Sequence, residues 1–161
     1  MRVEKERQKS ILAEIYGKYE KSGEEHGDFW IQLQADNFLE VVNKLRSFDD
    51  ASFDSFVDLC GVDFSPAHPR FESVVHLYSR KWGHRIRLRV MVPDESITVP
   101  SITHLWKGAN WQERESYDMY GIRYEGHPDL RRILSPPKID VHPQRKDYPL
   151  KGDRDLGGDL Q

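Results

Sequence analysis

Two neighbouring runs of alternating residues constrain the fold of this chain most. Residues 71–79 and 85–92 each have the two-residue period of a β-strand, and the five residues between them suit an antiparallel hairpin. The second run alternates apolar and cationic side chains: Ile86, Leu88, Val90 and Val92, with Arg85, Arg87 and Arg89 between them. Because successive strand side chains point to opposite faces, one face of the hairpin is predicted to be core and the other cationic.

The residues before this hairpin predict two helices and two strands. Apolar spacing indicates a helix over 2–21, stopped by Ser22-Gly23, and then a strand over 29–34. A second helix follows Asp36-Asn37, which could cap it, and its apolar side is Phe38, Val41, Val42 and Leu45. The mostly apolar run 56–62 is predicted to be a central strand that buries Cys60.

The residues after the hairpin predict two more helices. Pro100-Ser101 can open a short helix through Trp106, and Asn110 can cap a second helix over 111–120. Gly121 stands where a helix-ending glycine belongs. The fold class expected is α+β, with a mainly antiparallel sheet and flanking helices.

The composition changes after Ile122. Five of the nine prolines fall between positions 128 and 149, and no helical or strand period persists there. We therefore divide the chain into a globular domain, residues 1–122, and an extended proline-rich C-terminal segment, residues 123–161. That segment could fold back on its own domain, extend freely or lie on another subunit. Its mixture of arginines and apolar anchors favours docking on another subunit.

Charge and composition exclude several kinds of function. The net charge is -3, from 24 basic and 27 acidic residues, which argues against general nucleic-acid binding. The arginine row could serve a small RNA-binding module, but a solvated or acid-paired sheet face is the favoured interpretation. One cysteine cannot supply an ordinary iron–sulfur site, and the seven scattered histidines do not favour a metal.

No run approaches the roughly 18 apolar residues that span a bilayer, and the N-terminus alternates charge signs. We expect a cytoplasmic protein that meets a membrane only through partners. The acidic group Glu113, Glu115 and Asp118 is interpreted as structural rather than catalytic. Arg114 and Asp118, four residues apart on one helix, are predicted to pair.

The most informative block runs from Trp111 to Leu150. It contains ERESYDMYGI at 113–122, GHPDLRRIL at 126–134 and RKDYPL at 145–150. With these motifs, and with the strands before them, residues 27–152 resemble the C subunit of the proton-pumping NADH:quinone oxidoreductase, the 30-kDa subunit family of respiratory complex I. One departure is Asp140 to Gln144, where the family often has a tryptophan-glycine stretch before the last motif; we expect it to change local docking contacts only.

The resemblance implies a non-catalytic subunit of an enzyme complex. It implies no cofactor in this chain, with FMN and iron–sulfur clusters in partner subunits, and a position in the peripheral arm against the quinone-site subunit of the 49-kDa type. The complex would transfer electrons from NADH to quinone, coupled to proton translocation, at the cytoplasmic face of the bacterial inner membrane. The chain is expected to be the separate form rather than one fused to the quinone-site subunit.

The partner-docking residues predicted from the motifs and the resemblance are Glu113, Arg114, Glu115, Asp118, His127, Leu130, Arg131, Arg132, Ile133, Leu134, Arg145, Lys146, Asp147, Tyr148 and Leu150. One alternative is the equivalent subunit of a ferredoxin- or F420H2-driven quinone oxidoreductase or of a membrane-bound hydrogenase. The other alternative is the small RNA-binding module.

Overall fold

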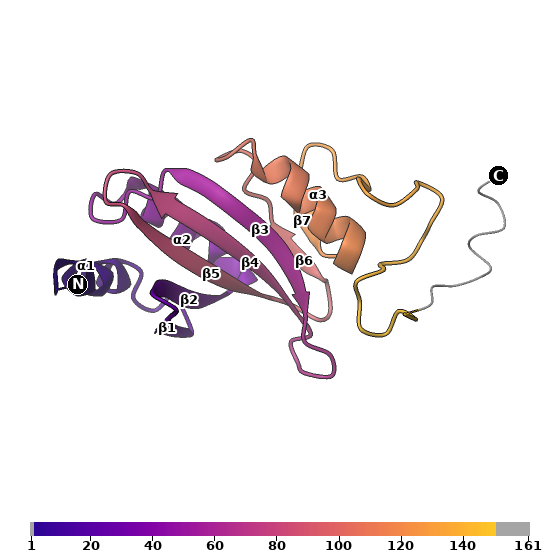
Figure 1. Cartoon of the computed structure of the whole chain (residues 1–161), viewed down its shortest axis with the longest axis horizontal. Helices are drawn as coiled ribbons and strands as arrows, with labels where there is room; N and C mark the ends of the chain where they lie inside the picture. The colour runs from indigo at the N-terminus through magenta and orange to yellow at the C-terminus, as the bar shows by residue number, and fades with distance from the viewer. Residues whose placement is uncertain (1, 151–161) are drawn as a thin grey trace.

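A mixed five-stranded sheet forms the centre of the molecule (Figure 1). The computed structural model describes residues 2–150, with side chains from residue 6 onward. The sheet order is β1 (Lys21–Glu25), β2 (Asp28–Gln34), β5 (His84–Val92), β4 (Phe71–Ser79) and β3 (Ser55–Asp63). In this sheet only β2 and β5 run parallel, so the predicted mainly antiparallel α+β fold is confirmed.

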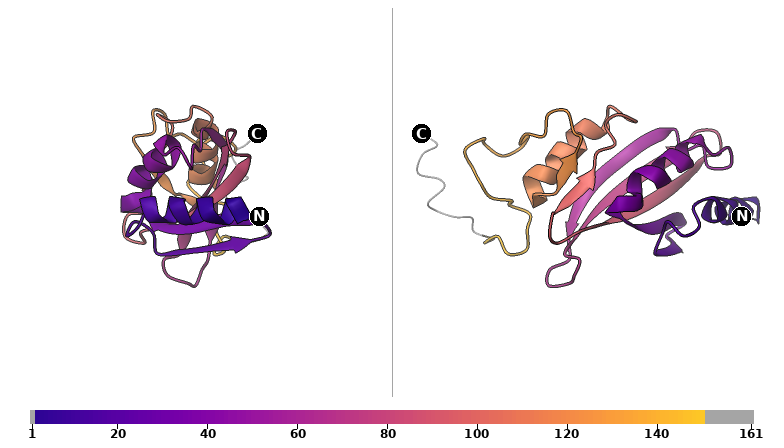
Figure 2. Two further views of the ribbon diagram at one scale, coloured as in Figure 1. Left: turned by 90° about the vertical axis from the view of Figure 1, so that its left-hand side faces the viewer. Right: turned by 180° about the vertical axis from the view of Figure 1, so that it is seen from behind.

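Two helices cover one face of this sheet. Seen from behind in Figure 2, α2 (Ala35–Ser47) lies across the strands, and its buried side chains include the predicted Phe38 and Leu45. The helix α3 (Ala109–Tyr120) lies beside β3, where Gly61 lets the ring of Tyr120 approach the strand closely. The helix α1 (Arg2–Glu14) packs at the opposite end of the molecule, where Ser10 donates to Asp50.

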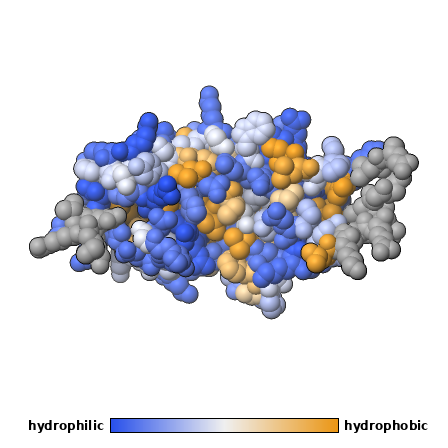
Figure 3. Space-filling model, in the orientation of Figure 1, coloured by the Kyte–Doolittle hydropathy of each residue, from blue (hydrophilic) through white to orange (hydrophobic). Residues whose placement is uncertain are grey.

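The hairpin of β4 and β5 has the predicted pairing and the predicted two faces. Leu88 and Val90 of β5 are fully buried against the helices. On the other face, Arg89 pairs with Glu72 at 2.9 Å and Arg87 with Glu25 at 3.3 Å. Arg85 is exposed, so the arginine row is partly acid-paired and partly solvated, in line with the favoured interpretation. Figure 3 shows that side of the molecule, with small hydrophobic patches among polar residues.

The first predicted helix is too long. The chain leaves α1 after Glu14 and turns at Gly17, whose φ is 77°, and Ser22-Gly23 lies inside the edge strand β1 instead of ending a helix. Gly23 is required there because the indole of Trp30 covers it. An added Cβ would stand 2.8 Å from that ring.

Three further predictions are wrong. The strand β3 lies at the sheet edge instead of the centre, and Cys60 is exposed because it lies on the same sheet face as Arg89, which the helices do not cover. No helix forms over 101–106: only residues 103–105 make a turn, and the Ser101 hydroxyl and the Ile102 amide bind the Glu113 carboxylate instead of opening a helix. Neither α2 nor α3 has a side-chain N-cap, since Gln34 and Gly108 occupy those positions.

A small parallel ladder follows the main sheet. The strand β6 (Thr98–Pro100) pairs with β7 (Arg123–Glu125), and neither was expected from the sequence. Tyr124 of β7 is buried, and its hydroxyl lies 2.9 Å from the hydroxyls of Ser73 and Ser116. This network joins the main sheet, α3 and β7. Within residues 2–150, no helix combines the length and apolar character needed to cross a bilayer.

Candidate docking face of α3 and the C-terminal strap

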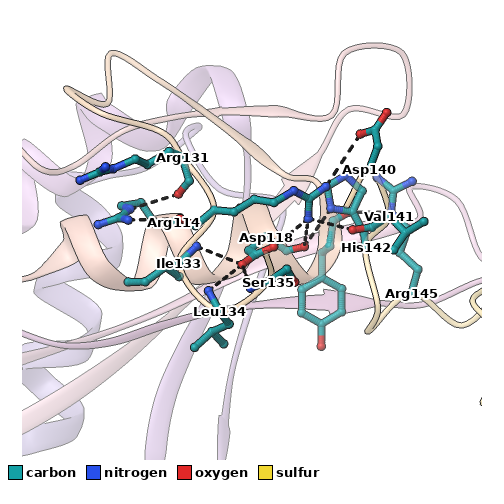
Figure 4. A network of polar contacts seen from close by, with 12 residues as sticks. Arg114, Asp118, Arg131, Ile133, Leu134, Ser135, Asp140, Val141, His142 and Arg145 are labelled. Atoms are coloured by element: carbon teal, nitrogen blue, oxygen red, sulfur yellow. Dashed lines mark hydrogen bonds and ion pairs between the residues drawn. The ribbon is translucent and has the colours of Figure 1, made fainter. Parts of the chain in front are cut away.

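Residues 126–150, here called the strap, have no regular secondary structure and pack against α3 (Figure 1). Their main attachment is Asp118, a fully buried carboxylate (Figure 4). One Asp118 oxygen accepts from the Arg132 guanidinium at 2.7 Å. The other accepts from three consecutive strap amides, those of Ile133, Leu134 and Ser135, at 2.8 to 3.0 Å. Asp118 thus fixes both the position and the backbone conformation of the strap.

The electrostatics of Asp118 depend on these partners. Burial alone would raise the pKa of this carboxyl, but the three amide hydrogen bonds and Arg132 outweigh burial and lower the pKa to about 2. Asp118 is therefore ionised at neutral pH, and its charge compensates Arg132, whose side chain is only 10% exposed.

The predicted pair between Arg114 and Asp118 does not form. Asp118 is taken by the strap, and Arg114 donates instead to the carbonyl oxygens of Arg131 and Arg132 at 3.1 and 3.2 Å. Its guanidinium lies 5.6 Å from the ring centroid of Trp111, one turn earlier on α3. A contact far apart in sequence has replaced the local one.

The strap is attached again at the C-terminal end of α3. His142 donates through Nδ1 to the Asp118 carbonyl at 2.9 Å, and Arg145 donates to the Tyr120 carbonyl at 2.7 Å. Gly121 ends α3 with a φ of 78°, and a Cβ there would collide with the side chains of both His142 and Arg145. A glycine is needed for the backbone conformation and for this close approach.

A third attachment connects the strap to the end of β3. Arg70 bridges Asp63, at 2.7 Å, and Asp147, at 2.9 Å, while the Lys146 amide donates to Asp63 at 2.9 Å. The hydrogen bonds from Arg70 hold the pKa of Asp63 well below its usual range. The strap is therefore tied to α3 and to the sheet along most of its length.

Glu113 connects α3 to the segment before it. Its carboxylate is fully buried and accepts from the Ser101 hydroxyl at 2.7 Å and the Ile102 amide at 2.8 Å. Burial raises the pKa of Glu113 to about 7, because no cation lies among the groups that shift it. This carboxyl therefore connects α3 to residues 101–102 inside the domain.

Residues 31–154 match the protein family described as respiratory-chain NADH dehydrogenase, 30 Kd subunit. The chain belongs to this family. It is 44% identical over 148 residues to the C 2 subunit of NADH-quinone oxidoreductase from Rhizobium meliloti (strain 1021), covering 91% of this chain and 80% of that protein. The C subunit of the same enzyme from Legionella pneumophila (strain Lens) is 39% identical over 166 residues, covering 84% of this chain and 73% of that protein.

Two solved structures share the fold of this chain. A trypsin-resistant fragment of Nqo5 is 34% identical, with a TM-score of 0.65, and the match covers 81% of this chain and all of the fragment. A chain of an archaeal membrane-bound sulfane sulfur reductase has a TM-score of 0.76 at 21% identity, over 91% of this chain and 86% of its own, and shows the fold alone. The resemblance is confirmed: this is a complex I subunit of the 30-kDa family.

The predicted docking residues of this 30-kDa-family subunit differ in exposure. Glu113 and Asp118 are buried and contact other parts of the same chain, so any part they take in docking is indirect. Arg131, Lys146 and the two leucines at 134 and 150 are exposed. These four lie along the strap, and their docking role stays a prediction.

Among the other predicted residues, His127 has the clearest structural part. His127 donates through Nε2 to the Asn110 carbonyl and accepts the Asp129 amide at Nδ1, which holds the turn at the strap's beginning. The remaining positions are half-buried or exposed along α3 and the strap: Glu115, Leu130, Ile133, Arg145, Asp147 and Tyr148. The rest of the predicted C-terminal segment, residues 151–161, lies outside the described residues.

Three residues of this face were not predicted from the sequence. Arg70 lies 77 positions before its strap partner Asp147, and Asp63 lies 83 positions before its strap partner Lys146, so no local pattern connects them. Trp111 is 64% exposed, and an apolar ring at that helical position gave the only local signal. Within residues 2–150, no group of three or more His, Cys, Asp or Glu side chains is arranged to hold a metal ion.

Proposed function

We propose that this complex I subunit is a structural element of the peripheral arm that docks through α3 and the strap. Its neighbours are the quinone-site subunit of the 49-kDa type and adjoining peripheral-arm subunits. FMN and the iron–sulfur clusters reside in partner subunits, and this chain supports their electron path without carrying it. The complex binds this chain peripherally, at the cytoplasmic face of the bacterial inner membrane.

The observation that carries this proposal is the attachment of the strap by Asp118. A buried ion pair and three amide hydrogen bonds hold a segment that has no regular secondary structure, and large apolar side chains on it and beside it stay exposed. Trp111 is 64% exposed and Leu134 is 63% exposed. Ordered backbone beside exposed aromatic and apolar anchors is typical of the centre of a protein–protein interface.

We also propose that the chain divides near residue 122 into a domain and a docking segment. The related Nqo5 fragment is trypsin-resistant, and this chain aligns with its whole length. This favours a compact domain that folds without most of the C-terminal segment. Because Tyr124 is buried in the polar network with Ser73 and Ser116, a truncation that tests the division must keep β7.

The experiment is a truncation after Glu125, compared with the full chain in cells that assemble the complex. We expect the truncated chain to give the circular dichroism of a folded domain and to be absent from the complex recovered through a tagged partner. The full chain, purified alone, should be colourless and inert toward NADH. Normal incorporation of the truncated chain would contradict the proposal, as would a bound flavin or cluster in the isolated protein.

The alternatives have less support. The relatives described above are named as subunits of NADH-quinone oxidoreductase, which favours that donor over ferredoxin or F420H2 and over a hydrogenase. The RNA-binding alternative required a free row of arginines, whereas Arg87 and Arg89 are paired with Glu25 and Glu72.

A further inference from the structure

A cavity of about 650 Å³ lies between α3 and the strap. Three arginines line it, Arg114 on the helix and Arg131 and Arg132 on the strap. The remaining wall includes the Tyr117 ring, Leu130 and Ile139. Figure 4 shows Arg114 and Arg131 together on one side of Asp118, with Asp140 on the other. We call this space the arginine cavity.

The three arginines are not equally compensated. Arg132 is neutralised by buried Asp118. Arg131 contacts Asp129 at 2.9 Å, but both side chains are more than half exposed, so water screens the pair and it contributes little. Asp140 adds one acidic group on the wall, 3.8 Å from Arg132, and its side chain is fully exposed.

Of the three arginines, Arg114 has no carboxylate partner among the described residues. Among residues 2–150, its polar partners are the carbonyl oxygens of Arg131 and Arg132, and no carboxylate lies within ion-pair distance of it. Asp118 lies four residues further along the same helix, but both of its carboxylate oxygens accept hydrogen bonds from the strap. A half-buried guanidinium whose hydrogen bonds go only to neutral dipoles has capacity left for a carboxylate.

We propose that the arginine cavity receives an acidic side chain from an extended segment of a neighbouring subunit in the complex. The carboxylate lies between Arg114 and Arg131, whose planar guanidiniums suit two-pronged binding. An apolar residue next to it in the same segment packs on Leu130, Ile139 and the Tyr117 ring. This inference rests on the proposed docking function and specifies the chemistry of the partner.

The surroundings favour a peptide over a free anion. A phosphate or lipid headgroup would use the guanidiniums alone, whereas here apolar side chains share the wall with them. Trp111, 64% exposed, lies against Arg114, and Leu134 is exposed on the strap nearby. Hydrophobic side chains also gather at this end of the surface in Figure 3. Tryptophan and arginine are among the residue types most enriched at positions that dominate protein–protein binding energy.

The first test compares charge changes on one strap. Arg131→Glu combined with Arg114→Gln removes the proposed partners of the acidic side chain. Lys138→Glu is the matched control, because Lys138 is an exposed strap residue that does not line the cavity. Each full-length variant is expressed in place of the native chain, and its share in the complex is measured by quantitative mass spectrometry. We expect the share of the double variant in the complex to fall about tenfold and that of the control to change little.

The two proposals fail differently in this test. Equal incorporation of the double variant and the Lys138→Glu control overturns the arginine cavity, and the truncation after Glu125 then still decides the docking function by itself. Retained exchange protection of the strap amides in the double variant shows that any loss of incorporation is not a loss of folding.

The second test identifies what lies in the cavity. The photo-crosslinker p-benzoylphenylalanine replaces Asp140, an exposed wall residue, and the assembled complex is irradiated and digested. We expect a crosslinked peptide from another subunit that contains Asp or Glu next to an apolar residue. A crosslink to lipid, or crosslinks within this chain only, would overturn the inference.

Discussion

Asp118→Asn is the substitution that should detach the strap without disturbing the sheet. The amide has nearly the same shape as the carboxylate but no charge, and it leaves Arg132 in a buried position without its main counter-ion. It also weakens the acceptor for the amides of Ile133, Leu134 and Ser135. All of these interactions hold the strap, so the free energy of strap docking should fall more than the stability of the core.

The magnitude follows from the pKa. The partners of Asp118 lower its pKa from 3.8 to about 2, so the folded state prefers the ionised carboxyl by about 2–3 kcal/mol. The sign is that of a depressed acid: the stabilisation is complete above about pH 4 and is lost as the pH falls through 2. At neutral pH, removing the charge should raise the exchange rate of the strap amides about a hundredfold.

Hydrogen exchange followed by mass spectrometry measures the exchange rate of the strap amides directly. Peptides covering 130–145 should lose protection in the variant, while peptides from β4 and β5 should not. Asp129→Asn is the matched control, because Asp129 also pairs with an arginine but lies at the surface. Its effect should be under about threefold. Equal strap protection in the Asp118 variant and the native chain would refute the reasoning.

Three further substitutions test other contacts. The pKa of Glu113 is raised to about 7, so its protonated form stabilises the folded state. The free energy of unfolding should therefore fall by about 3 kcal/mol as the pH rises from 4.5 to 7. Urea titrations of Glu113→Gln should show no such dependence on pH. Gly121→Ala should cost at least about 1 kcal/mol and release His142, because a Cβ collides there at a φ of 78°; unchanged strap exchange would contradict this. Tyr124→Phe should cost about 1–3 kcal/mol, since two buried hydroxyls lose their shared partner; an unchanged urea midpoint would count against the network.

Residue periodicity predicted those parts of the fold that depend on local pattern. The hairpin of β4 and β5, the strand β2 and the helix α2 follow from alternation and helical spacing, because each buries a single continuous apolar face. The strand β1 escaped prediction because its residues are polar and it is held by pairing with β2, and the place of β3 at the edge depends on the whole sheet order.

The candidate site was predictable in its motifs but not in its contacts. The spacing of Arg114 and Asp118 predicts a pair on one helix turn, and the structure gives Asp118 to Arg132 instead. Three amides and a guanidinium outweigh one side-chain pair on a helix surface, which is worth only a few tenths of a kcal/mol. A tertiary contact of this kind leaves no periodic signal in the sequence.

The most direct test of the docking account is hydroxyl-radical footprinting of the chain free and within the complex. Trp111 and Leu134, on α3 and the strap, are both more than 60% exposed here. Tyr16 is 83% exposed and follows α1 by two residues, and α1 lies at the opposite end of the molecule (Figure 1). The account predicts that oxidation of Trp111 and Leu134 falls sharply on assembly, well beyond any change at Tyr16. Equal oxidation of Trp111 and Leu134 in the free and assembled chain would contradict it.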